Sequence, residues 1–170
     1  RAALVPTVNG PVEAGTPPGS PYVALDTTAE VAGTSHFVIV DRWGDAVSMT
    51  TTVESGFGSG RMAAGFFLNN QLTDFAFSPI DAAGRPAANA VAPGKRPRSS
   101  MAPVIVLDRQ GRLVALLGSP GGNSILAYNA KALIGVLDWN LSMQAAFDQP
   151  NLVVRGSSVG ADTELFADPV

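Results

Sequence analysis

The fold is decided by the stretch Gly33-Thr34-Ser35-His36-Phe37-Val38-Ile39-Val40, in which a threonine after a glycine opens an apolar run. Residues 37–40 are all β-branched or aromatic, which predicts a strand. Residues 41–45 contain a glycine, and residues 46–53 return to a strand-like composition. The two runs therefore predict a β-hairpin that begins close to Thr34.

The Gly33-Thr34 step also has a chemical interpretation. Cleavage of this bond would give Thr34 a free α-amine beside its hydroxyl, and such an amine can act as the general base for a poor nucleophile. Before cleavage, the hydroxyl can attack the Gly33 carbonyl and shift the acyl group from nitrogen to oxygen. A glycine leaves that path open. Because a Gly-Thr step entering a strand is most often only a turn, this interpretation depends on the rest of the chain.

Composition narrows the classes of function. The 170 residues, 46% of them hydrophobic, suit one packed domain. The net charge of −3 argues against a nucleic-acid partner. The absence of cysteine excludes disulfides and thiolate catalysis, and the single histidine, His36, argues against a histidine metal cluster, so no metal and no cofactor is expected. No apolar run approaches the roughly 18 residues that span a bilayer.

The remaining pattern predicts an α+β fold. Residues 1–33 are rich in proline and glycine and predict a linker, with a short extended piece over 22–25, whereas residues 34–170 predict an ordered domain. We expect a short strand over 66–68, a long loop over 78–98 and a second hairpin from 104–107 and 113–117. A largely buried helix over 123–137 and a short helix capped by Ser142 follow.

The loop 118–122 (GSPGG) joins a predicted strand to a predicted helix. Its amides would lie at the positive end of that helix, where a phosphate or the oxyanion of a tetrahedral intermediate is stabilised. The Gly-Lys-Ser/Thr ending of a phosphate-binding P-loop is absent. A turn that simply needs glycine dihedrals remains the alternative.

Five segments occur in the order and at the intervals found in one family. They are residues 33–37 (GTSHF), 50–54 (TTTVE), 68–75 (LNNQLTDF), 95–103 (KRPRSSMAP) and 118–122 (GSPGG). From Thr34 to about Arg155 the chain resembles the small subunit of γ-glutamyltranspeptidase, an N-terminal-nucleophile hydrolase. The resemblance implies half of an αββα sandwich, an inactive precursor that cuts itself between Gly33 and Thr34, and residues 1–33 as the end of the large subunit.

The resemblance also implies roles for individual residues. Thr34 would be the nucleophile, Thr52 would hydrogen-bond to Thr34 and orient it, and the Gly121 and Gly122 amides would hold the oxyanion. Asp74 would accept from the α-ammonium of a γ-glutamyl group, Glu54 and Gln71 would line the same amino-acid pocket, and Ser99 and Ser100 would donate to the α-carboxylate. Arg98 stands where the family commonly has leucine, and it either assists binding of an acidic group or faces solvent.

The implied activity is transfer of a γ-glutamyl group from a donor such as glutathione to water or an amino acid. The implied partner is the large subunit of the same precursor, and the implied location is the periplasm or the outside of the cell. Two alternatives stay open: an acylase for glutaryl-type amides, which needs no partner for an ammonium group, and a non-catalytic fragment or paralogue that keeps only the scaffold.

Overall fold

The computed structural model describes residues 18–20, 24, 33–155 and 158–162. The chain forms two compact units, residues 20–129 and residues 1–19 with 130–170. Most of the predicted linker, including residues 22 and 23 of the expected extended piece, lies outside the described residues. Ala24 forms an isolated bridge to Ala87. The division at Thr34 remains a prediction about the precursor.

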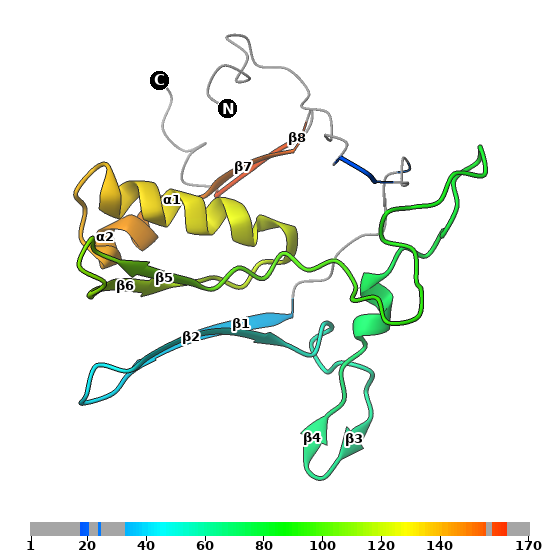
Figure 1. Cartoon of the computed structure of the whole chain (residues 1–170), viewed down its shortest axis with the longest axis horizontal. Coiled ribbons are helices and arrows are strands. Elements are labelled where there is room, and N and C mark those ends of the chain that lie inside the picture. The colour runs from blue at the N-terminus through cyan, green and yellow to red at the C-terminus, as the bar shows by residue number, and fades with distance from the viewer. Residues whose placement is uncertain (1–17, 21–23, 25–32, 156–157, 163–170) are drawn as a thin grey trace. The chain divides into compact units, whose positions relative to one another are not determined.

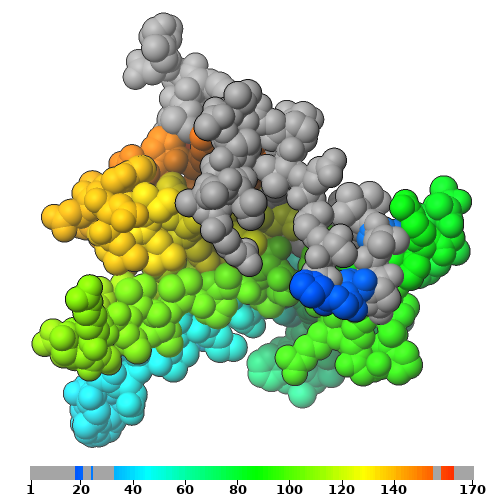
Figure 2. Space-filling model, turned by 45° about the horizontal axis from the view of Figure 1, so that its top comes forward, coloured from blue at the N-terminus to red at the C-terminus, as the bar shows by residue number. Residues whose placement is uncertain are grey.

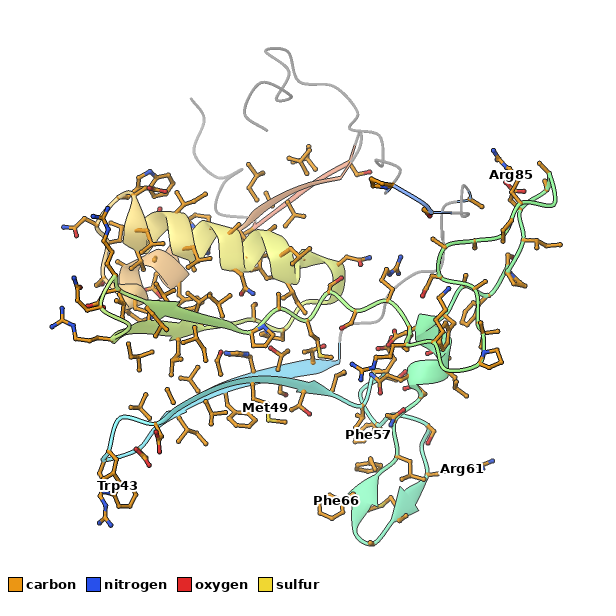
Figure 3. All side chains as sticks on the ribbon, viewed as in Figure 1. Trp43, Met49, Phe57, Arg61, Phe66 and Arg85 are labelled. Atoms are coloured by element: carbon orange, nitrogen blue, oxygen red, sulfur yellow. The ribbon has the colours of Figure 1, made fainter. Side chains whose placement is uncertain are left out.

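The predicted first hairpin is confirmed (Figure 1). Strand β1, Thr34–Val40, pairs antiparallel with β2, Ala46–Thr52, in a register that places Thr34 opposite Thr52. Because side chains alternate between the two faces of a strand, Thr34 and His36 share one face of the hairpin. Trp43 lies at the tip, 74% exposed, under the Arg42 guanidinium at 3.9 Å from the ring centroid (Figure 3).

One five-residue turn, Asp-x-x-Gly-x, occurs three times in the described chain. In each turn the aspartate side chain accepts hydrogen bonds from the backbone amides two and four residues later. The turns are residues 41–45, 81–85 and 108–112. The second and third turns add an ion pair from the final arginine to the aspartate, and these bonds lower the pKa of Asp81 and Asp108. An aspartate that satisfies the turn's own amides explains why these hairpins close locally.

The second predicted hairpin is also confirmed. Strand β5, Val104–Leu107, pairs antiparallel with β6, Leu113–Leu117, with an irregularity between Val106 and Leu107. The β1–β2 hairpin packs along β6, and Figure 2 shows the cyan hairpin against the light green one. The Ser48 hydroxyl donates to the Leu117 carbonyl at 3.2 Å. Leu117 is 2% exposed, so this contact lies in the core of the unit.

Between these hairpins the chain forms small local elements. The predicted strand at 66–68 is found as β4, Phe66–Phe67, which pairs with β3, Met62–Ala63. The 3₁₀-helix η2, Gln71–Asp74, follows. The region 78–98 is irregular as expected, apart from isolated bridges such as Ile80 to Pro86.

The helices begin close to their predicted positions. The short 3₁₀-helix η3, Gly122–Ser124, leads into α1, Ile125–Leu137, and Ser142 caps α2, Met143–Asp148, by accepting from the Ala145 amide. The expectation of a largely buried α1 is wrong: Ile125 is 1% exposed, but Leu126 and Leu137 are more than half exposed. The hairpin of β7, Leu152–Arg155, and β8, Ser158–Ala161, was not predicted.

Candidate active site

A cavity of about 360 Å³ lies where β1 begins and β2 ends. It carries two carboxylates, two guanidinium groups and six hydroxyls, together with one amide side chain. The lining residues are Thr34, Thr50, Thr51, Thr52, Glu54, Gln71, Asp74, Arg96, Pro97, Arg98, Ser99, Ser100, Met101, Gly122 and Ile125. The predicted Thr34, Thr52, Gly122 and all five predicted substrate-binding residues line this one cavity. Gly33 and Gly121 are not among its lining residues.

The Gly33-Thr34 bond lies at the wall of the cavity and is held by Thr52. The Thr52 hydroxyl donates to the Gly33 carbonyl at 3.0 Å, and the Glu54 amide donates to the Thr52 oxygen at 2.8 Å. In the uncut chain the Thr52 hydroxyl therefore contacts the carbonyl of the proposed scissile bond. The expected bond from Thr52 to Thr34 remains a prediction for the cut chain.

Gly33 is confined by the backbone of the loop after β2. A Cβ atom built at Gly33 would collide with the Glu54 carbonyl oxygen and come within 3.2 Å of the Ser55 carbonyl carbon. Only glycine fits this position without movement of that backbone.

Glu54 itself has an unusual conformation. It is 8% exposed and has φ of 75°, a left-handed value that non-glycine residues adopt at a cost. Backbone strain of this kind persists only where the surroundings enforce it, and here it places a buried glutamate in the wall of the cavity.

Asn70 organises the wall that carries Gln71 and Asp74. Its side chain accepts from the Ser55 amide at 3.0 Å and donates to the Ser55 and Thr73 hydroxyls, each at 3.0 Å. These bonds fix η2 against the loop after β2. Both Gln71 and Asp74 then line the cavity, and the buried Nε2 of Gln71 has no hydrogen-bond partner among the described residues.

The opposite wall is the segment 96–101, joined to η2 by Asn89. The Asn89 side chain donates to the Asp74 carbonyl at 2.5 Å and accepts from the Arg98 amide at 2.9 Å. Asn89 is 8% exposed, so it is a buried bridge between the two walls. Arg98 is half-buried in the cavity wall, which corrects the alternative that it faces solvent.

The glycine-rich loop meets the cavity at the N-terminal end of η3. Gly121 and Gly122 have φ of 131° and 54°, values that favour glycine, and a Cβ at Gly121 would lie 2.8 Å from the Tyr128 ring. The loop joins β6 to η3 and α1, as predicted. Its amides therefore lie at the positive end of a helix, where a developing negative charge is stabilised.

Sequence reasoning missed several lining residues. Thr50 shares a hairpin face with Thr52 by the two-residue period of a strand, so that period was an available signal. Arg96 and Met101 lie on either side of Arg98, Ser99 and Ser100, but nothing in the sequence spacing predicted that they line the cavity. Asn89 carried no signal, because its role depends on contacts with residues that are distant in the sequence.

Within the described part of the chain, no group of three or more acidic or histidine side chains is placed to hold a metal ion. No described helix is long and apolar enough to cross a membrane.

Comparison with known proteins gives consistent relatives. The sequence model of γ-glutamyltranspeptidase matches residues 6–166. A glutathione hydrolase proenzyme of Bacillus subtilis is 39% identical over 127 residues, which is 74% of this chain and 20% of that protein. An acivicin-inhibited γ-glutamyltranspeptidase structure aligns with TM-score 0.67 and 34% identity, covering 79% of this chain and 74% of that one. The enzyme of Pseudomonas nitroreducens bound to L-DON aligns with TM-score 0.62 and 40% identity, covering 71% and 65%.

These structures have the N-terminal-nucleophile hydrolase fold. The predicted fold class, an α+β half of an αββα sandwich, is therefore confirmed. The chain spans about a fifth of the length of the curated relatives it matches. The family model, by contrast, covers nearly the whole chain. This chain belongs to the γ-glutamyltranspeptidase family.

Proposed function

We propose that the protein containing this chain catalyses hydrolysis or transfer of γ-glutamyl groups through Thr34, after cleavage of the Gly33-Thr34 bond. The observation that carries the proposal is the hydrogen bond from Thr52 to the Gly33 carbonyl, made where Thr34 lines a polar cavity. Relatives at 34–40% identity are named glutathione hydrolase proenzymes, and one related structure is described in terms of autoprocessing and catalysis.

Cleavage would begin with attack of the Thr34 hydroxyl oxygen on the Gly33 carbonyl carbon. The Thr52 hydroxyl, itself held by the Glu54 amide, would stabilise the negative charge that develops on the Gly33 oxygen. Collapse of the tetrahedral intermediate breaks the C–N bond, gives the Thr34 nitrogen the proton lost by the hydroxyl, and leaves an ester. Water then hydrolyses the ester and frees both the Gly33 carboxylate and the Thr34 hydroxyl.

The freed Thr34 amine would then serve catalysis as the base. It takes the hydroxyl proton as the oxygen attacks the γ-carbonyl of the donor, and it returns that proton to the departing amine. The amides of Gly121 and Gly122 lie at the start of a helix, where they would hold the oxyanion. Attack of water or of an amino-acid amine on the acyl-enzyme releases the product and restores Thr34.

The charges of the cavity suit a zwitterionic amino-acid group. Asp74, with Gln71 and Glu54, would bind the α-ammonium end, and the unpartnered Nε2 of Gln71 is free to donate to an oxygen of the ligand. The Ser99 and Ser100 hydroxyls on the opposite wall would bind the α-carboxylate. Charge-assisted hydrogen bonds of this kind give both affinity and orientation.

We further propose that the remainder of the protein supplies a large subunit. Periplasmic or extracellular location is part of the same proposal. Water or an amino acid would be the acceptor.

The test is release of an aniline from a γ-glutamyl anilide by the full-length protein. Thr34→Ala should abolish release, and Thr34→Ser should retain part of it because a hydroxyl and an α-amine remain. Ser35→Ala is the matched control, since it removes an exposed hydroxyl one residue along the same strand and should leave the rate nearly unchanged. Full activity in Thr34→Ala would contradict the proposal.

Asp74→Asn distinguishes the glutaryl-type acylase. Loss of a charge-assisted hydrogen bond costs about 1.5–3 kcal/mol, so KM for a γ-glutamyl donor should rise about 10- to 100-fold. A glutaryl amide lacks the ammonium group, and its turnover should barely change. If Asp74→Asn leaves the γ-glutamyl KM as it was and the glutaryl amide is the better substrate, the acylase is the correct assignment.

A further inference from the structure

His36 lies between the proposed nucleophile and the proposed oxyanion loop. It follows Thr34 by two residues on the same face of β1 and stands opposite Thr50 in the register of the hairpin. Its Nδ1 lies 2.9 Å from the Thr50 hydroxyl oxygen, and Thr50 in turn lines the cavity. This bond fixes the plane of the imidazole ring relative to the strand pair.

Gly118, the first residue of the glycine-rich loop, lies against the same ring, nearest to its Nδ1 and Cε1 atoms. A Cβ built at Gly118 would overlap the His36 imidazole, and the three nearest atoms all belong to that ring, with Nε2 at 2.7 Å. Gly118 is not among the residues with positive φ. A positive φ is therefore not what requires glycine at position 118, and the His36 ring is the nearest obstacle to a side chain there.

This contact sets the start of the loop that carries Gly121 and Gly122. The preceding residue, Leu117, is buried, and its carbonyl accepts a hydrogen bond from the Ser48 hydroxyl. The end of β6 is therefore held in place where the loop begins. The backbone at Gly118 rests on the imidazole, and the four residues that follow reach the start of η3. Burial lowers the pKa of His36, which favours the neutral ring, and its buried Nε2 has no partner among the described residues.

We propose that His36 is a positioning residue: its ring sets the separation between β1, which carries Thr34, and the loop 118–122, whose amides face the reacting carbonyl. This inference rests on the proposed function. Catalytic geometry is sensitive to such a spacer, because a displacement of about 1 Å can cost about 100-fold in rate.

The experiment uses four variants of the full-length protein, with kcat and KM measured on a γ-glutamyl anilide and referred to the cleaved fraction. Gly118→Ala should lower kcat by about 100-fold, because the new methyl collides with the ring and moves the loop. KM should change by less than about threefold, since the ammonium and carboxylate sites are untouched. Gly56→Ala is the matched control, because a Cβ there meets open space at a glycine without positive φ.

The decisive variant combines His36→Ala with Gly118→Ala. Removal of the ring makes room for the methyl, so kcat and the thermal midpoint of the double variant should both exceed those of Gly118→Ala, kcat by about tenfold. His36→Ala alone should lower kcat more than it changes KM. A Gly118→Ala protein that fails to fold but is recovered by the second substitution supports the same contact.

Two results separate this inference from the proposed function. A wild-type protein that is active, combined with a double variant no better than Gly118→Ala, overturns the spacer and leaves the function standing. A wild-type protein that releases no aniline from the γ-glutamyl anilide overturns the proposed function and the inference together.

Discussion

The Thr52 side chain contacts the carbonyl oxygen of Gly33, the residue before the proposed nucleophile. The proposed cleavage chemistry depends on this one contact. The Thr52 hydroxyl donates a hydrogen bond to that oxygen and accepts one from the Glu54 amide, so the hydroxyl has one defined orientation. A carbonyl polarised in this way is more electrophilic, which is what an attack by the neighbouring Thr34 hydroxyl requires.

Gly33→Ala tests the confinement of this carbonyl. The added methyl would collide with the Glu54 carbonyl, and overpacking of this kind costs about 1–3 kcal/mol. If that cost is added to the activation free energy of the cleavage between Gly33 and Thr34, cleavage should slow by about 10- to 100-fold. The fraction of uncut chain, followed over time after synthesis, measures the effect. Gly56→Ala should cut at the normal rate, and a Gly33→Ala chain that cuts equally fast would show that the clash is relieved without cost.

At the scale of elements, the site is built where the β1–β2 hairpin, η2, the segment 96–101 and the start of η3 meet. One wall comes from η2, the other from the segment 96–101, and Asn89 bridges them through the Asp74 carbonyl and the Arg98 amide. The bridge is buried, so each of its bonds is made away from competing water.

Asn89→Ala should separate the two walls. It removes the bonds to a part-buried amide and a part-buried carbonyl, each at a cost of about 1 kcal/mol or more. We expect a lower thermal midpoint and a KM for γ-glutamyl anilide raised by about tenfold or more. Gln110→Ala, which removes an amide side chain from an exposed turn, is the control. An unchanged KM in a destabilised Asn89→Ala protein would restrict the bridge to a structural role.

The elements that sequence predicted and those it missed differ in one physical respect. Both long hairpins have runs of β-branched and other apolar residues on either side of an aspartate turn, and Ser142 caps α2, so local chemistry identifies them. The pairing of β3 with β4 was not predicted, because the turn between them uses Ala64 and Gly65, with φ of 51° and 84°. Two positive φ values suit such a hairpin, but an alanine there gives no signal in the sequence.

The sequence motifs pointed to many of the residues that line the cavity, but not to the contacts that hold these residues in place. The motifs singled out Thr34, Asp74 and Ser99, and all three line one cavity, while their roles stay predictions. The strained Glu54 and the bridge of Asn89 depend on contacts between distant segments. One sequence contains no signal for them.

At the scale of the whole molecule, the chain spans about a fifth of the length of the curated relatives it matches. The face of the β1–β2 hairpin turned away from β5–β6 is apolar and accessible, with Phe37, Ile39, Val47 and Met49 between 40% and 54% exposed. Figure 3 shows Met49 on that face. Accessible apolar area of this kind is typical of an interface.

Oxidation of Met49 tests whether the rest of the protein covers this face. In the isolated chain, peroxide should convert Met49 to its sulfoxide readily, because the side chain is 45% exposed. In the full-length protein the same residue should be protected, as peptide mass spectrometry would report. Equal rates of oxidation in the two proteins would mean that the face stays open to solvent.

The central claim is that Thr34 becomes a chain terminus, and the mass of the subunits of the purified full-length protein tests it most directly. We predict two polypeptides, the smaller beginning at Thr34, and a single unbroken polypeptide for Thr34→Ala. An active wild-type protein whose main chain is intact between Gly33 and Thr34 would contradict the account.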